Sequence, residues 1–151
     1  MNHHFIQNQR AEENPRTAAV RNFAERVEGY EFVCLLTHDT DARERFTSEV
    51  LRLLPEETVY VRTRIGDFID EMVEAVMKAE QKNFRKKYSE ADVLLLEDFE
   101  RVTQKEATQT ELCRILGERI EAKKPVLLTG KPPESGCMEE LEALLKRAAA
   151  V

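Results

Sequence analysis

The sequence predicts a three-layer α/β fold, in which helices cover both faces of a mostly parallel sheet of about four strands. Short unbroken apolar runs recur along the chain, and such runs suit strands that are buried on both faces. Segments with apolar residues at helical spacing lie between these runs. Parallel strands need crossover connections, which helices supply, so this alternation indicates an open α/β sheet.

The elements follow from the same two patterns. The apolar runs predict strands at residues 32–36, 59–61, 93–96 and 126–128. The helical spacing predicts helices at 17–27, 43–54, 68–79, 108–122 and 138–149. Ligands of an open parallel sheet bind at the carboxyl ends of its strands. The residues after the first, third and fourth strands are therefore the candidates for a functional site.

Size and charge narrow the class of protein. The 151 residues suit one domain, 1–151, in which we expect 1–13 to be a flexible N-terminal segment. Hydrophobic residues make up 42% and charged residues 34%, as in a soluble globular protein. The net charge of −6 does not favour non-specific binding to nucleic acid. No apolar run approaches the roughly 20 residues that span a bilayer, so we expect no membrane association.

The cysteines indicate a reducing compartment. Cys34, Cys113 and Cys137 are odd in number, and no two of them have C-x-x-C spacing. This argues against a disulfide framework or a zinc site and for a cytoplasmic protein. Cys34 lies within an apolar run, where cysteines are usually inert core residues.

Two acids follow the third expected strand. Glu97 and Asp98 come directly after the apolar residues 93–96. In P-loop ATPases an acid at this place holds magnesium, and a neighbouring group orients the attacking water. Polar residues also commonly end strands at the rim of a sheet, so the pattern alone does not decide between the two interpretations.

The segment after the first expected strand departs from a working phosphate-binding loop. That loop reads G-x-x-x-x-G-K-[ST], and its glycines let backbone N–H groups surround the phosphates. Here glycine is absent, and Asp39 and Asp41 bring negative charge. Arg43 takes the place of the lysine and Glu44 that of the magnesium-binding hydroxyl residue. Asp39, Thr40 or Asp41 can each cap the helix that follows. The altered segment consists of Thr37, His38, Asp39, Thr40, Asp41, Ala42, Arg43 and Glu44.

The sequence resembles the DnaA family of bacterial replication initiators, within the AAA+ class. The resemblance is most specific at 83–98, which reads NFRKKYSEADVLLLED, and it continues through 104–111. It resumes at 126–133, VLLTGKPP, where Thr129 and Gly130 match the family's sensor-1 region. Weaker similarity covers 5–54. The resemblance implies an AAA+ core of the P-loop NTPase fold, with Glu97 and Asp98 as the Walker B acids.

Departures from the family pattern accompany the resemblance. The Walker A segment is altered, and Gly130 stands where the family has an acid. The family's helical lid and DNA-binding domain have no counterpart in the 151 residues. A lid usually supplies part of the adenine pocket. We therefore expect no cofactor, with ATP and magnesium only if the altered loop still holds nucleotide.

Three functions remain open from the sequence. The first is a non-hydrolysing protein-interaction module of replication initiation or its regulation, with an initiator, a loader or a second copy as partner. The second is a residual ATPase that uses Arg43, Glu97 and Asp98. The third is a single-stranded DNA-binding module, which the charge balance does not favour. A basic cluster beside Phe84 and Tyr88 could serve the third, although a solvated helix face with its aromatic rings in the core is the preferred interpretation. The cluster consists of Lys82, Arg85, Lys86 and Lys87.

Overall fold

The computed structural model describes residues 14–151, so the expectation for 1–13 falls outside the described residues. Five parallel strands form one sheet in the order β2-β3-β4-β1-β5. The strands are β1 (Phe32–Leu36), β2 (Tyr60–Arg64), β3 (Val93–Glu97), β4 (Val126–Gly130) and β5 (Ala149–Ala150). The predicted α/β architecture with a parallel sheet is confirmed.

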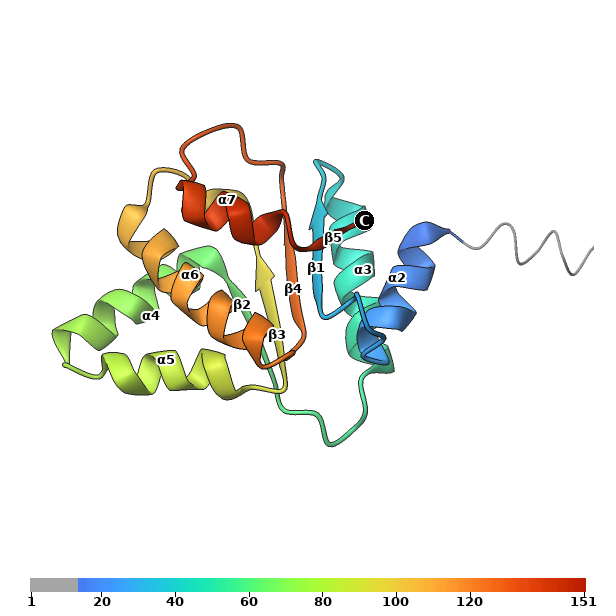
Figure 1. The fold of residues 1–151 in the computed structure, drawn as a ribbon, viewed down its shortest axis with the longest axis horizontal. Helices are drawn as coiled ribbons and strands as arrows, with labels where there is room; N and C mark the ends of the chain where they lie inside the picture. The colour runs from blue at the N-terminus through green and yellow to red at the C-terminus, as the bar shows by residue number, and fades with distance from the viewer. Residues whose placement is uncertain (1–13) are drawn as a thin grey trace, which may run out of the picture.

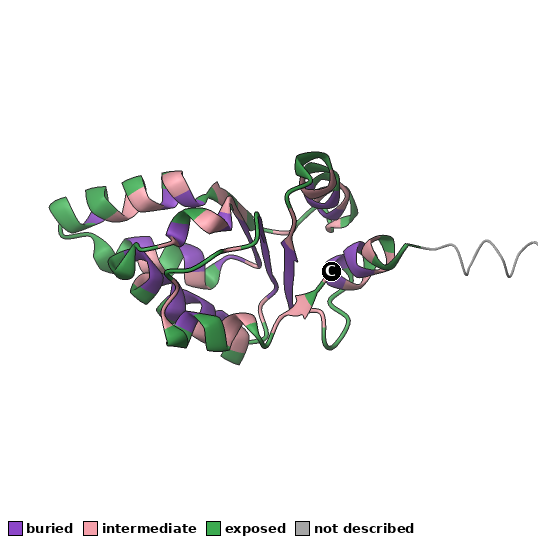
Figure 2. Cartoon of the chain, turned by 90° about the horizontal axis from the view of Figure 1, so that it is seen from above, coloured by how far each residue is buried: buried purple, intermediate pink, exposed green. Residues whose placement is uncertain are grey.

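Helices cover the two faces of the sheet in unequal numbers (Figures 1 and 2). One face carries α2 (Pro15–Ala24) and α3 (Thr40–Leu53). The opposite face carries the remaining helices of the described chain (Figure 1). These are α4 (Ile65–Met77), α5 (Gln81–Glu90), α6 (Glu106–Glu121) and α7 (Glu139–Leu145), with the short 3-10 helix η1 (Phe99–Val102).

Alternate strand residues enter two separate cores. In β1, Val33 and Leu35 pack with α2 and α3, whereas Phe32 and Cys34 pack with the helices of the other face. The strand β3 divides its residues in the same way. This alternation follows from the period of two along a strand, and it explains why the central strands read as unbroken apolar runs.

Both edges of the sheet differ from the sequence prediction. The predicted helix at 138–149 ends at Leu145, and Ala149–Ala150 forms the fifth strand beside β1. The second strand was expected to be buried on both faces, but it is an edge strand with Tyr60 48% exposed. An edge strand pairs on one side only, so fewer of its side chains are covered.

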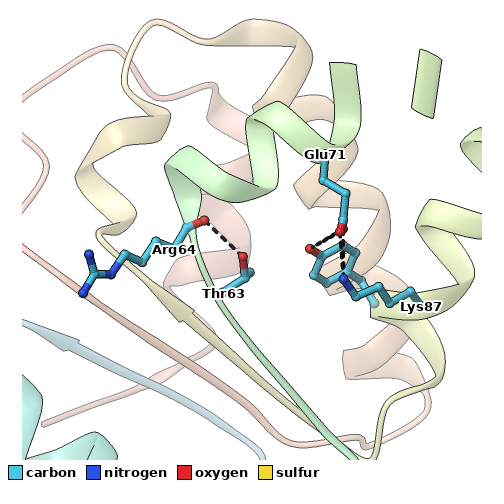
Figure 3. Close-up of polar contacts among 5 residues, drawn as sticks. Thr63, Arg64, Glu71 and Lys87 are labelled. Carbon is cyan, nitrogen blue, oxygen red and sulfur yellow. Dashed lines mark hydrogen bonds and ion pairs between the residues drawn. The ribbon is translucent and has the colours of Figure 1, made fainter. Parts of the chain in front are cut away.

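The helices α4 and α5 form a hairpin held by aromatic rings and one acid. Phe68, Phe84 and Tyr88 contact one another with ring centroids 4.9–5.1 Å apart. Glu71 accepts hydrogen bonds from the Tyr88 hydroxyl and from Lys87 Nζ, each at 2.7 Å, and Figure 3 shows Lys87 reaching Glu71. Phe84 and Tyr88 are buried, which confirms the interpretation of the basic cluster as an outer helix face with aromatic rings in the core.

A buried arginine, which the sequence did not reveal, joins two loops. Arg119 of α6 is 0% exposed and donates hydrogen bonds to backbone carbonyls just before β3 and just before β4. The acceptors are the carbonyl oxygens of Tyr88, Ser89, Ala91, Asp92 and Pro125. Burial lowers the pKa of Arg119 to about 10, so the side chain is charged at neutral pH. The guanidinium therefore ties the α5–β3 loop to the α6–β4 loop.

Within residues 14–151, no helix has both the length and the apolar character needed to cross a membrane.

Candidate functional site

The three predicted site segments meet where the central strands end, at the carboxyl-terminal edge of the sheet. The strands β3, β4 and β1 are neighbours, so their carboxyl ends bring Glu97, Gly130 and Thr37 to the same edge. The Thr37 N–H donates to the Gly130 carbonyl oxygen at 2.9 Å. The fold therefore places the three predicted site segments together, as parallel topology requires.

The connection between β1 and α3 is short. Since β1 ends at Leu36 and α3 begins at Thr40, only Thr37, His38 and Asp39 lie between them. A phosphate-binding loop places the whole of G-x-x-x-x-G between its strand and its helix. Within the altered segment, Thr40, Asp41, Ala42, Arg43 and Glu44 are therefore helical.

The N-terminus of α3 is occupied by the chain's own acid. Asp39 is the N-cap residue, and its Oδ1 accepts a hydrogen bond from the Ala42 N–H at 3.0 Å. Asp41 adds a second negative charge in the first turn. Free N–H groups at a helix N-terminus are what would bind a phosphate. Here a carboxylate already accepts from one of them, and both acids would repel an anion.

Arg43 folds back onto the loop between β1 and α3. Its Nη1 donates to the Thr37 carbonyl oxygen, and its Nη2 lies 3.3 Å from the Thr40 hydroxyl. The lysine of a phosphate-binding loop points its charge at the phosphates. The hydrogen bonds of Arg43 stabilise the short loop instead.

Glu97 ends β3 and is held by an arginine from the neighbouring strand. Arg62 of β2 donates from Nε to Glu97 Oε1 at 2.7 Å and from Nη2 to Oε2 at 3.2 Å. The hydrogen bond to Glu97 raises the pKa of Arg62, burial opposes the rise, and the charge of Glu44 adds to it. The bidentate pair engages both carboxylate oxygens of the Walker B-like glutamate. The sequence alone does not single out Arg62, because the register that brings it to Glu97 depends on which strands are neighbours.

Asp98 adopts the left-handed conformation, with φ of 58°. It caps η1, and its carbonyl oxygen accepts from the Arg101 N–H at 3.0 Å. Asp tolerates this conformation better than most residues. No group of three or more His, Cys, Asp or Glu residues that could hold a metal ion occurs within residues 14–151.

Gly130 is the point of closest approach between β4 and η1. A Cβ atom at this position would lie 2.6 Å from the backbone nitrogen of Phe99 and 2.7 Å from Glu100 Oε2. Its neighbour Thr129 is buried and pairs in register with Leu35. Position 130, which the resemblance predicts to be the sensor-1 position, therefore has no room for a side chain while η1 lies here.

The basic cluster of α5 has two of its four charges paired. Arg85 binds Glu111 of α6 at 2.7 Å, and Lys87 binds Glu71 of α4 at 2.7 Å. Lys82 and Lys86 are exposed. The cluster therefore offers less positive charge to nucleic acid than its sequence suggests.

The cysteines are predicted to differ in reactivity. Burial raises the pKa of Cys34 to about 12 and that of Cys113 to about 11, whereas Cys137 is half-buried. At pH 8 the Cys34 thiolate fraction is on the order of one in ten thousand. We expect iodoacetamide to modify Cys137 first, and Cys34 and Cys113 only after denaturation, as measured by peptide mass mapping. Fast labelling of Cys34 in the native protein would contradict its place in the core.

Parts of the chain are similar in sequence to bacterial initiators. It is 31% identical over 80 residues to the chromosomal replication initiator protein DnaA of Methylacidiphilum infernorum, a match covering 53% of this chain and 18% of that protein. It is 36% identical over 63 residues to DnaA of Borrelia duttonii, covering 42% of this chain and 13% of that protein. The matches thus span less than a fifth of these relatives' length.

Solved structures share the fold over most of the chain. AMPPCP-bound DnaA from Aquifex aeolicus matches with a TM-score of 0.78 and 20% identity, over 93% of this chain and 46% of that one. A replication initiator DnaA bound to AMPPCP and single-stranded DNA matches with a TM-score of 0.75 and 22% identity, over 89% and 44%. The DnaC helicase loader matches with a TM-score of 0.60 and 14% identity, over 89% and 81%. At these identities the likeness establishes the AAA+ fold.

The family assignment rests on a longer match. Residues 41–149 match the family described as the bacterial DnaA ATPase domain. This span begins in the first turn of α3 and reaches β5, so it contains Glu97, Asp98 and Gly130. The chain therefore belongs to the bacterial DnaA ATPase-domain family.

Proposed function

We propose that this DnaA-type AAA+ domain has lost a working Walker A loop and acts as a non-hydrolysing protein-interaction module. Its setting would be the initiation of DNA replication or the regulation of that step. The family supports the setting, since the matched relatives carry the name chromosomal replication initiator protein. The partner would be an initiator, a helicase loader or a second copy of the chain, and the three free cysteines suit a cytoplasmic location.

The observation that carries the proposal is the three-residue connection between β1 and α3. A triphosphate needs several backbone N–H groups that converge on it from a glycine-rich loop. Thr37, His38 and Asp39 offer a shorter connection with no glycine, and the carboxylate of Asp39 binds the helix N-terminus itself. We infer that this geometry disfavours phosphate both by shape and by charge.

The other site residues support the same inference. The carboxylate of Glu97 is engaged by Arg62, and a guanidinium at that place would oppose a magnesium ion. Gly130 supplies no side chain to a γ-phosphate, and its contact with η1 leaves no space for one. We infer that the residues present do not fit ATP and magnesium, and no reaction step is assigned to them.

The two alternatives have narrower support. A residual ATPase would have to release Arg43 from the Thr37 carbonyl and Glu97 from Arg62 before either could meet nucleotide. A single-stranded DNA-binding module is suggested by the DNA-bound DnaA relative. However, two of the four basic side chains of the α5 cluster are paired with glutamates.

Isothermal titration calorimetry with ATP and ADP tests the proposal. With magnesium present, we expect no heat of binding and no change in melting temperature at millimolar nucleotide, because the loop does not gather N–H groups around a phosphate. A DnaA protein with an intact Walker A loop is the positive control. Micromolar affinity for either nucleotide would reject the proposal and favour the residual ATPase, in which case Arg43→Ala should weaken the binding.

A further inference from the structure

The outer face of α4 carries an exposed apolar stripe. Val73 is 49% exposed, Val76 is 55% exposed and Met77 is 82% exposed. These residues lie three and four positions apart, so they form one continuous surface along the helix. They are hereafter called the α4 stripe. Three large apolar side chains gathered on one helix face are typical of an interaction site, unlike single exposed residues scattered over a surface.

The packing of α4 within the domain is complete without the stripe. Its inner face buries Ile65, Phe68 and Ala75 in the core. Glu71 joins α4 to α5 through the hydroxyl of Tyr88 and the ammonium of Lys87. The helix is therefore apolar on two sides, and only one of them is used by the described fold. Because α4 is held firmly, it presents the stripe as a preformed surface.

Negative charge surrounds the stripe. Residues 65–80 contain five acids and one lysine. Glu74 is paired with that lysine, Lys78, and Glu71 with Lys87 of α5, each at 2.7 Å, which leaves three acids in excess. Asp70 lies three residues before Val73 on the same side of the helix, is exposed, and has no ion pair within residues 14–151. An occupant that covers the stripe must place its own charges beside these carboxylates.

The charge decides between classes of occupant. Phosphates of nucleic acid and the headgroups of an anionic membrane would be repelled by these acids. A second copy that presented its own α4 stripe would bring like charges together. The neighbouring helix α5 is basic, but its apolar residues Phe84 and Tyr88 are buried, so a second copy of α5 offers no apolar side chains. A helix with an apolar stripe and flanking lysines or arginines complements both properties.

We propose that the α4 stripe is the docking surface for a basic amphipathic helix of a partner protein. This inference rests on the proposed function as a protein-interaction module and names the surface and the chemistry of the partner. The residues from Ile69 to Met77 extend about 12 Å along the helix axis, which matches two turns of a partner helix. Such a helix would place apolar residues at i, i+3, i+4 and i+7 against the stripe.

A synthetic peptide provides the probe. We would use a helical peptide about 18 residues long, with leucines at i, i+3, i+4 and i+7 and lysines elsewhere, and measure binding to the full chain by fluorescence anisotropy. We expect saturable binding that weakens at least about tenfold in the double variant V73S/M77S, since buried apolar side chains contribute on that scale. The single variant D70K should also weaken binding, because it reverses a flanking charge.

Matched variants distinguish binding at the α4 stripe from non-specific binding of the peptide elsewhere on the surface. V59S removes another exposed apolar side chain, and E121K reverses an exposed acid on α6, so neither should change the affinity. A peptide with glutamates in place of the lysines should not bind. Absence of binding to the native chain, or equal losses in V59S and V73S/M77S, would overturn the inference.

The same variants test the two other possible occupants of the stripe, a second copy of the chain and single-stranded DNA. Sedimentation of the chain alone reports a second copy, and binding of an oligothymidylate reports single-stranded DNA. Dependence of either one on Val73 and Met77 would reassign the stripe and overturn the inference. Nucleotide calorimetry is independent of these measurements, because α4 lies outside the β1–α3 loop. Failure at the stripe with no nucleotide binding would remove the docking surface and leave the proposed function standing.

Discussion

Replacing Arg119 with methionine should lower the free energy of unfolding by about 3–5 kcal/mol. The guanidinium is fully buried and donates to five backbone carbonyls, which lie in the last turn of α5 and in the two loops and are at least partly withdrawn from water. Methionine keeps the length and the apolar stem but donates no hydrogen bond, so these acceptors lose a partner at about 1 kcal/mol or more each. Methionine also removes the desolvation cost of the buried positive charge, which offsets part of the lost stability. Urea denaturation followed by circular dichroism measures the effect.

A neighbouring arginine provides the control for Arg119. Arg114 lies on the same helix, its side chain is 51% exposed, and its contact with Glu111 spans 3.7 Å. Arg114→Met should therefore change the stability by less than about 0.5 kcal/mol. Arg119→Lys should fall between the two, because an ammonium has three donors and reaches fewer carbonyls. Equal stabilities of the Arg119 and Arg114 variants would mean that Arg119 does not join the loops.

Replacing Gly130 with alanine should destabilise the domain by about 1–3 kcal/mol. The added Cβ would lie 2.6 Å from the Phe99 backbone nitrogen, and a backbone atom cannot move away as a flexible side chain can. Either η1 shifts from the end of β4 or the clash persists. Gly130→Asp should destabilise the domain more than Gly130→Ala, because it adds a carboxylate beside Glu100. Thermal and urea unfolding measure both variants.

A glycine in α6 provides the control for Gly130. A Cβ at Gly117 would meet nothing within 4 Å, and the residue is in the middle of the helix. Gly117→Ala should therefore stabilise the domain by up to about 1 kcal/mol through helix propensity. The two substitutions are chemically identical and are expected to have opposite signs. Stabilisation by both would show that η1 does not press against β4.

Much of the fold could be predicted from local patterns. The apolar runs at 32–36, 93–96 and 126–128 correspond to β1, β3 and β4, because a strand covered on both faces needs apolar residues at every position. The capping role of Asp39 could also be predicted, since it depends only on residues within the same turn. The weakly patterned ends were less predictable. The strand β5 contains only two residues, and its pairing with β1 is a tertiary contact.

Part of the candidate site could likewise be predicted from the sequence, and part could not. The types of residue after each strand, and the absence of glycine from the loop after β1, are properties of the sequence. The partner of each side chain is not, because it depends on strand order and on loops that are distant along the chain. Arg62 and Glu97 are 35 positions apart along the chain. They meet only because β2 and β3 are neighbours in the sheet.

The sequence by itself determined the α/β class, the order of the main elements and the family to which the chain belongs. These depend on periodicity and on local motifs, which each segment carries independently. Only the tertiary structure decided that Glu97 is paired with Arg62, that η1 occupies the space beside Gly130, and that Arg119 joins two loops. The same holds for the α4 stripe, since burial on one side of a helix and exposure on the other are set by what packs against it. Contacts between distant residues are fixed by close packing of the whole domain, and no local pattern encodes them.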